Sequence, residues 1–364
     1  MDQFYNPDFK PLVETAERFA EREILGKVVK LDSLEKPGFP WDAIRAGGEA
    51  GFLCGPLSEE VGGGSLGIEA LAVLIEKLAE GAAGPAMIFA AHLAVTATLA
   101  GFEALKPMLS KMAEHAADSQ PFLFGVALPK TAVSLDRPAI PLVEEKKGDL
   151  VIAGDFVCFP APTSCRQVML VTGEKDAQAA LVDSDRFKAL SEATYPGSGL
   201  EEFSATGLKL DNFKVSDDEV LDKSACQPLW RHLRILTASA QLGNARAAAR
   251  QAWEYAGERI QTGRKIIEHQ DVRRTLENMA ELLSAMLGMA RLAASAPTGN
   301  AAVALARHAY TFCGTAAEQV CLDAIQTLGG YGYMKDYGLE KRARDAKSLQ
   351  CLLGTYIEDI LGET

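Results

Sequence analysis

The sequence predicts an α+β protein with three successive domains: an N-terminal helical domain over residues 1–119, a small middle β domain over 120–224 and a C-terminal four-helix bundle over 225–364. In the first and last of these regions, apolar residues recur at helical spacing. The middle region instead has short apolar runs separated by turn residues, which is typical of strands. A chain of 364 residues is long enough for two or three domains, because single domains usually have about 100 to 200 residues.

The N-terminal region is expected to be entirely helical. Residues 8–23 predict an amphipathic helix, because apolar residues such as Phe9 and Ala16 recur at helical spacing. The segments 68–83 and 85–115 are rich in Ala and Leu and contain few helix-breaking residues. They predict two or three packed helices.

The middle and C-terminal regions have different periodicities. Six apolar runs predict strands, and they cover residues 122–128, 139–143, 150–159, 167–171, 179–182 and 207–215. After Pro228 the helical spacing returns and predicts four helices with the lengths and breakers of a bundle. Their expected ranges are 229–262, 270–294, 299–328 and 340–361.

Composition excludes some classes of partner. The net charge of −12 argues against nucleic acid or an anionic membrane surface, because the long-range field of the protein would repel both. Apolar residues make up 48% of the chain and charged residues 24%, which describes an ordinary soluble globular protein. We therefore expect an acidic soluble enzyme or enzyme subunit.

The seven cysteines include no C-x-x-C pair and the histidines do not cluster, so neither a disulfide framework nor a metal site is predicted. Reduced thiols are the simplest expectation. The N-terminal stretch M-D-Q-F-Y-N-P-D has no basic segment followed by an apolar run, and no apolar stretch reaches the roughly eighteen residues of a membrane helix. We expect a cytoplasmic location.

The most informative stretch runs from Gln326 to Thr355 and reads Q-T-L-G-G-Y-G-Y-M-K-D-Y-G-L-E-K-R-A-R-D-A-K-S-L-Q-C-L-L-G-T. By themselves, Gly329 and Gly330 are consistent with a helix stop before a solvated charged turn. They do not form a dinucleotide fingerprint, because no strand precedes them and the glycine spacing differs. Taken together, Q-x-x-G-G-x-G-Y, E-K-x-x-R-D-A-K and Q-x-x-x-G-T resemble the C-terminal signature of the acyl-CoA dehydrogenases.

This resemblance covers nearly the whole chain in length and order. It implies a helical domain, a middle β-barrel and a C-terminal bundle, with FAD held between barrel and bundle and with the bundles assembled into dimers or tetramers. It also implies an acyl-CoA thioester as substrate, electron-transfer flavoprotein as electron acceptor and a place in fatty acid metabolism.

In the family that the chain resembles, one subunit helps to complete the FAD site of its neighbour. The family motif R-x-x-F-G…H-Q reads R-I-Q-T-G-R-K-I-I-E-H-Q here; it keeps Arg259, His269 and Gln270 and has Thr262 in place of the aromatic residue. A guanidinium suits a pyrophosphate because its planar fork pairs with two phosphate oxygens at once. Without the flanking match, Arg259 would be read as a surface charge and His269 as a structural histidine.

Four residues of the C-terminal signature match further cofactor positions. Gln326, Gly329 and Gly330 match residues near the adenine end of FAD, where glycine allows the backbone to approach the cofactor. Thr355 matches a residue at a helix start close to the phosphates, where backbone N–H groups favour anions. The resemblance therefore implies that all four bind the cofactor.

The middle region departs from the family pattern. The segment 127–136 keeps only Pro129, Ser134 and Asp136 of the family motif T-E-P-x-x-G-S-D, with one extra residue, so Ser134 is the matched position for contact with flavin and substrate. The later family motif W-I-[ST]-N becomes C-F-P-A, in which Pro160 offers neither a hydroxyl nor an N–H to the flavin N5. Any contact to N5 would have to come from another group.

The general base of the family is missing as well. In the family, a carboxylate removes the α-proton while the β-hydrogen leaves as hydride, and the glutamate that usually precedes the Gly-Thr pair is Leu353 here. Some members take the base from the residue before a helix arginine; that arginine matches Arg234, a predicted substrate-binding residue, and the residue before it is Leu233. Three nearby acids are better explained as solvated charges: Asp336, Glu358 and Asp359. No catalytic residue is therefore predicted.

Two hypotheses about function follow. The first is an FAD-dependent acyl-CoA dehydrogenase-like oxidoreductase, or enoyl-CoA reductase, that acts on the Cα–Cβ bond of an acyl-CoA and forms a homodimer or homotetramer. The second is a catalytically silent subunit that completes the FAD site of an active paralogue in a hetero-oligomer, because the residues that serve a neighbour are kept while those that meet the chain's own flavin ring have changed. A purely structural protein has no motif in its favour.

Overall fold

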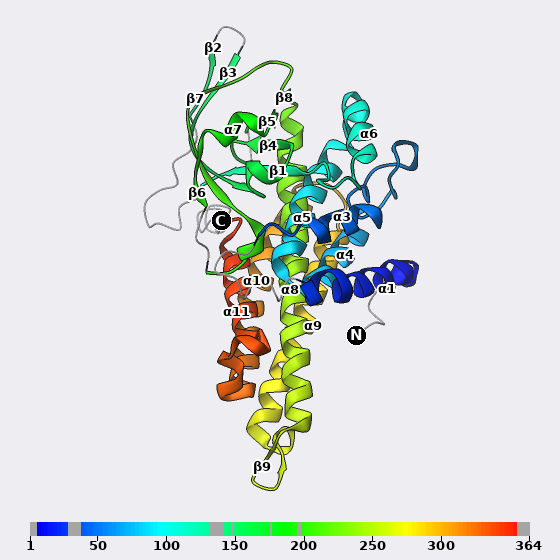
Figure 1. Ribbon diagram of the computed structural model, residues 1–364, viewed down its shortest axis with the longest axis vertical. Helices are drawn as coiled ribbons and strands as arrows, with labels where there is room; N and C mark the ends of the chain where they lie inside the picture. The colour runs from blue at the N-terminus through cyan, green and yellow to red at the C-terminus, as the bar shows by residue number, and fades with distance from the viewer. Residues whose placement is uncertain are drawn as a thin grey trace.

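A computed structural model describes residues 6–27, 38–130, 142–146, 149–174, 177–194 and 198–354. Figure 1 shows the N-terminal helices and the sheet at one end of the molecule, and the long C-terminal helices extending to the other end. Helix α8, Cys226–Glu258, connects these parts: it packs on α4 and α5, and the indole of Trp230 donates a hydrogen bond to the carbonyl of Gly173 after strand β4 (2.9 Å). The regular elements therefore follow the predicted order of helices, strands and helices.

The described N-terminal region is helical, as predicted. Its α-helices are α1 (Lys10–Phe19), α3 (Trp41–Glu49), α4 (Ile68–Gly81), α5 (Ala83–Leu99) and α6 (Lys106–Glu114). Helix α1 buries Ala16 and Phe19 and continues as a π-helical segment, Ala20–Leu25, which confirms the helix expected over 8–23. Helix α5 has no polar face and is almost entirely buried, because an apolar surface on all sides has to be covered.

The middle region forms one sheet of eight strands. They are β1 (Phe124–Pro129), β2 (Leu142–Lys146), β3 (Asp149–Phe159), β4 (Gln167–Val171), β5 (Ala179–Asp183), β6 (Ser191–Thr194), β7 (Thr206–Val215) and β8 (Val220–Leu221), with a short helix α7 (Asp185–Lys188). The order is β6-β7-β3-β1-β4-β5-β8, and β2 pairs with β3. Only β1 and β4 run parallel among the described pairs.

The closed barrel expected from the resemblance is wrong for the described residues, in which the sheet is open. The two ends of its strand order are β6 and β8, which are not paired with each other, and β2 is a further edge strand because it pairs with β3 alone among the described residues. Strands β6 and β8 have four and two residues. Such short strands provide too few backbone groups for a ladder that would close the sheet, because each residue contributes one N–H and one C=O.

The four predicted C-terminal helices are confirmed as α8, α9 (Gln270–Ser295), α10 (Asn300–Leu328) and α11 (Leu339–Cys351), and α10 packs on the other three. Two boundaries differ. The helix expected over 340–361 ends at Cys351, and residues 355–361 lie outside the described part of the chain. The helix expected to reach residue 262 ends at Glu258, and a small hairpin of β9 (Ile260–Gln261) and β10 (Arg264–Lys265) follows. Thr262 and Gly263 both have positive φ, as the tight turn of a two-residue hairpin requires.

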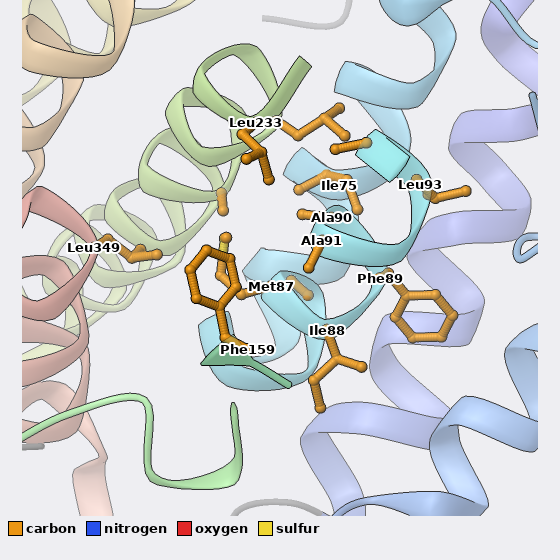
Figure 2. Close-up of a cluster of buried hydrophobic side chains, with 14 of the residues drawn as sticks. Ile75, Met87, Ile88, Phe89, Ala90, Ala91, Leu93, Phe159, Leu233 and Leu349 are labelled. Atoms are coloured by element: carbon orange, nitrogen blue, oxygen red, sulfur yellow. The ribbon is translucent and has the colours of Figure 1, made fainter. Parts of the chain in front are cut away.

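The core is continuous from the N-terminal helices to the bundle. Figure 2 shows Ile75 of α4, Met87 of α5, Phe159 of β3, Leu233 of α8 and Leu349 of α11 gathered in one place. We call these five residues the apolar cluster. All of them are fully buried. Side chains from four helices and one strand thus hold the three regions together.

Two further features concern the chain as a whole. Within the described ranges, no individual helix is long and apolar enough to cross a membrane, although α5 and the adjacent Glu103–Glu114 pass that test together with a bend of 119° between them. All seven cysteines are free thiols, and six of them are buried.

Candidate functional site

A pocket lies at the end of the C-terminal helices that is remote from the sheet, near β9 in Figure 1. Its volume is about 760 Å³. We call it the bundle-tip pocket. It brings together five of the residues that the sequence predicted to bind a cofactor: Arg259, His269, Gln326, Gly329 and Gly330. Gln270, the first residue of α9, is exposed next to the pocket but does not line it.

Arg259 is positioned by the end of α8. Its backbone N–H donates to the carbonyl of Tyr255 (2.8 Å), and its side chain is exposed. No carboxylate among the residues described here forms an ion pair with its guanidinium. The group is therefore available to an anion, which it can bind with two parallel hydrogen bonds.

His269 caps the N-terminus of α9 and is held by the hairpin. A guanidinium can only donate, so Nδ1 of His269 accepts the hydrogen bond from Nη2 of Arg264 (3.1 Å). In the neutral ring Nε2 then carries the proton, and it donates to the carbonyl of Gln261 (3.4 Å). Both ring nitrogens are occupied by the hairpin, which gives His269 a structural part in shaping the pocket.

The glycines stand where α10 ends. Gly329 has φ +61° and ψ −131°, a backbone conformation that residues with a Cβ do not readily adopt. This alone explains a glycine there as a helix stop. In addition, Gly329, Gly330 and the exposed Gln326 form one wall of the bundle-tip pocket. The structural and the cofactor-binding interpretations of these residues are compatible.

Two aromatic residues of the pocket were not predicted from the sequence. The rings of Tyr255 and Tyr331 meet edge to face with centroids 6.2 Å apart, and Tyr331 also contacts Tyr337 (5.4 Å). The spacing of Tyr255 and Arg259 was the available signal, because residues four apart share one face of a helix. Aromatic rings, a free guanidinium and a side-chain amide are the groups expected around an adenine ring and a pyrophosphate.

The remaining candidate site residues of the sequence analysis are not among those that line the bundle-tip pocket. Ser134 and Thr355, like Glu358 and Asp359, lie outside the described residues. Asp336 is exposed on a short turn between α10 and α11, in agreement with a solvated charge.

Arg234 is buried and forms an ion pair within the protein. Its guanidinium forms two parallel hydrogen bonds with Glu174 from the loop after β4 (2.7 and 2.8 Å) and lies over the ring of Trp230 (5.1 Å). Arg307 of α10 also reaches Glu174 (3.4 Å). Burial acts to raise the pKa of Glu174, but the hydrogen bond and charge of Arg234, with those of Arg307, lower it. The contact of Arg234 with substrate remains a prediction, and Glu174 was not expected.

The two positions of the family base are surrounded by hydrocarbon. Leu233 is fully buried within the apolar cluster (Figure 2), and Leu353 is 2% exposed. The backbone N–H of Leu353 donates to the hydroxyl of Tyr310 (3.1 Å), which in turn donates to the carbonyl of Gln350 (2.6 Å). Burial raises the pKa of Tyr310 well above its usual range, so this hydroxyl holds the chain in place as a neutral group.

The polar groups of the segment C-F-P-A form hydrogen bonds within the protein. Pro160 has no N–H. The N–H of Ala161 donates to the carbonyl of Ser204 (2.6 Å), and the thiol of Cys158 donates to the carbonyl of Pro160 (3.5 Å). These groups therefore provide no free donor at the position where the family contacts the flavin N5.

Comparison with known proteins gives a consistent picture. The family model for the acyl-CoA dehydrogenase N-terminal domain matches residues 6–115, and the model for the C-terminal domain matches 228–356. An acyl-CoA dehydrogenase of Bacillus subtilis is 27% identical over 353 residues, which cover 93% of this chain and 92% of that protein.

Solved structures share the fold. Butyryl-CoA dehydrogenase from Megasphaera elsdenii superposes with a TM-score of 0.84 at 20% identity, over 99% of this chain and 98% of that one. PigA, solved with FAD and proline, superposes with a TM-score of 0.83 at 20% identity, over 100% of this chain and 97% of that one.

Proposed function

Because the chain belongs to the acyl-CoA dehydrogenase family, we propose that it is an FAD-dependent oxidoreductase that acts on the Cα–Cβ bond of an acyl-CoA thioester. The observation that carries the proposal is the bundle-tip pocket, which gathers Arg259, Gln326 and Gly330 beside two tyrosine rings. Relatives with this fold include an acyl-CoA dehydrogenase and a protein solved with FAD.

The residues of the pocket have distinct parts in this proposal. Arg259 binds the pyrophosphate of FAD, and Gln326 and the backbone at Gly329–Gly330 contact its adenine end. His269 holds the hairpin that forms the pocket floor. FAD, when bound, supplies the acceptor for the hydride. Binding by a neighbouring subunit requires at least a dimer, so a homodimer or homotetramer is part of the proposal.

A second candidate is a silent subunit that completes the FAD site of an active partner. It is favoured by Leu233 and Leu353, which place hydrocarbon at both positions of the base, and by Pro160, which has no N–H for the flavin ring. Loss of a general base costs about 10²- to 10⁴-fold in rate. The first candidate therefore predicts slow turnover, and the second predicts none.

The visible spectrum of the purified protein tests the proposal. We expect FAD at one equivalent per chain, and slow loss of its absorbance when acyl-CoA thioesters are added without oxygen. Electron-transfer flavoprotein is the proposed acceptor and should restore the absorbance. A protein that cannot be loaded with FAD, or whose FAD never bleaches, would favour the silent subunit.

A further inference from the structure

Two buried polar side chains on α8 each have an oxygen without a hydrogen-bond partner. Thr237 and Gln241 are fully buried, and neither Oγ1 of Thr237 nor Oε1 of Gln241 has a partner. Other buried hydroxyls on helices do have one: Ser239 of the same helix donates to the carbonyl of Ile235 (3.0 Å), and Thr96 of α5 donates to the carbonyl of His92 (2.8 Å). Thr237 and Gln241 are two of several described residues with a buried polar atom that has no partner, and they differ from the others in being one turn apart on one face of the same helix.

Both oxygens lie on the face of α8 that meets α11. Nε2 of Gln241 donates to the carbonyl of Leu349 (3.3 Å), and Nδ2 of Asn244 on the same face donates to the carbonyl of Arg342 (2.8 Å). Residues 237, 241 and 244 follow one another at helical spacing, so Thr237 belongs to this face. Leu233 of the apolar cluster precedes Thr237 by one turn, a rise of about 5.4 Å.

The neighbouring helix α10 leaves room for Gln241. A Cβ at Gly314 would lie 3.0 Å from Nε2 of Gln241, so glycine at this position allows the amide to stand between α8 and α11. Because Nε2 points at a carbonyl, the orientation of the amide is determined and Oε1 is the atom that faces away from it. Oε1 can accept a hydrogen bond but cannot donate one.

An unpaired buried polar atom loses its hydrogen bonds to water and gains none in return, so folded proteins rarely leave one without a partner. The partner that fits here must donate to Gln241, and it can either donate to or accept from the hydroxyl of Thr237. A hydroxyl, an ammonium or an amide N–H meets both conditions. A carboxylate accepts only, and it would face Oε1 as a second acceptor.

We infer that the seam between α8 and α11 at Thr237 and Gln241 binds a hydrogen-bond donor carried by the acyl group of the thioester substrate. The inference rests on the proposed function, in which the reacting carbons lie next to Leu233 and Leu353. It names the class of that substrate: an acyl group with a hydroxyl, amino or amide group about one helical turn from the reacting carbons, in place of a plain hydrocarbon chain.

Calorimetric titration with CoA thioesters tests this substrate class. The probes are butyryl-, pentanoyl- and hexanoyl-CoA, their analogues with a terminal hydroxyl, and the corresponding analogues with a terminal carboxylate. We expect one hydroxyl analogue to bind about tenfold or more tightly than the plain thioester of the same length. The carboxylate analogue should bind no better than the plain one. Equal affinity for all three types would overturn the inference.

Substitutions test which residues cause the preference for the hydroxyl analogue. Thr237→Val and Gln241→Leu should each abolish the preference for the hydroxyl analogue, whereas Thr96→Val, the same change at a hydroxyl that has a partner, should keep it. Without ligand, Thr237→Val should raise the Tm and Thr96→Val should lower it, because only Thr96 loses a hydrogen bond. If Thr237→Val lowers the Tm as Thr96→Val does, the Thr237 hydroxyl has a partner within the protein and the inference is wrong.

The flavin spectrum separates this inference from the proposed function. A hydroxyl thioester that binds tightly without bleaching FAD would contradict the proposed activity but support the binding site. Plain thioesters that bind and bleach as well as the hydroxyl analogues would support the activity and overturn the site. A crystal structure in which a water molecule remains on both oxygens beside the bound hydroxyl analogue would also overturn the site.

Discussion

The bundle-tip pocket and the apolar cluster differ in what they offer to a ligand. At the tip, Arg259 and Gln326 are exposed around a cavity of about 760 Å³. At the apolar cluster Leu233 is fully buried, and Leu353, which is not one of its five residues, is 2% exposed, so both positions expected for a base are aliphatic and buried. The tip would serve the cofactor of a neighbouring subunit, and the cluster would serve the chain's own chemistry. In the proposed function, the residues expected to bind the cofactor are kept, whereas the residues expected to react with the substrate have changed.

The largest effect is expected from placing a base at Leu353. In FAD-loaded protein, Leu353→Glu should bleach the flavin with an acyl-CoA about 10²- to 10⁴-fold faster than Leu353→Gln. The glutamine variant is the matched control, because it has nearly the same shape and no base. Anaerobic stopped-flow absorbance measures both rates. Equal rates would mean that residue 353 does not face a bound substrate, which would break the comparison.

Two histidines with lowered pKa values, His92 and His232, should make the protein less stable in acid. Burial lowers the pKa of His92 to about 4, and burial followed by the charge of Arg231 lowers the pKa of His232 to about 4. Histidines in the unfolded chain have a pKa of about 6.5. Below that pH the unfolded state therefore binds more protons than the folded state, and the free energy of unfolding falls. Between pH 7 and pH 5 the free energy of unfolding should fall by about 2 kcal/mol for each ring.

Urea unfolding at the two pH values measures this loss. His232→Gln should unfold with roughly half the pH dependence of the wild-type protein, because His92 remains. His92 is fixed as a neutral ring by the N–H of Phe124, which donates to its Nδ1 (3.1 Å). Identical urea midpoints at pH 7 and pH 5 would contradict the lowered pKa of both rings.

A third test asks what Arg234 does. If it mainly supports the buried ion pair with Glu174, Arg234→Ala should lower the free energy of unfolding by about 3 kcal/mol, because it leaves a carboxylate with only Arg307 nearby. Lys106→Ala, which removes an exposed pair with Glu103, should leave the free energy of unfolding nearly unchanged. An Arg234→Ala protein as stable as the wild type would point instead to the predicted contact with substrate.

The smallest effect on the fold is expected at the tip. Arg259→Ala should weaken FAD binding about 10- to 100-fold, because a charge-assisted contact with the pyrophosphate is lost. Its Tm without FAD should remain at the wild-type value, since the side chain is exposed. Arg274→Ala, at an exposed arginine outside the pocket, is the control and should bind FAD normally. Unchanged FAD affinity of Arg259→Ala would remove the main support for the pocket.

Helices α8, α9 and α10 could be predicted from the sequence to within a few residues, because their apolar periodicity is a local signal, whereas α11 ends ten residues earlier than expected. The open sheet could not be predicted, because closure depends on how the short strands β6 and β8 lie in space, and these strands carry little sequence pattern of their own. Arg259 and Gln326 could be chosen by motif. The ion pair of Arg234 with Glu174, sixty residues away in the sequence, could not be predicted, because it depends on contacts in three dimensions. The same is true of the unpaired oxygens of Thr237 and Gln241.

The most direct test of the account is the flavin absorbance of the wild-type protein during titration with acyl-CoA thioesters under anaerobic conditions. The account predicts a yellow protein with one FAD per chain whose absorbance falls slowly when a thioester is added, and falls quickly in the Leu353→Glu variant. A colourless protein that cannot be reconstituted with FAD, or a bound flavin that no thioester reduces in either protein, would contradict it.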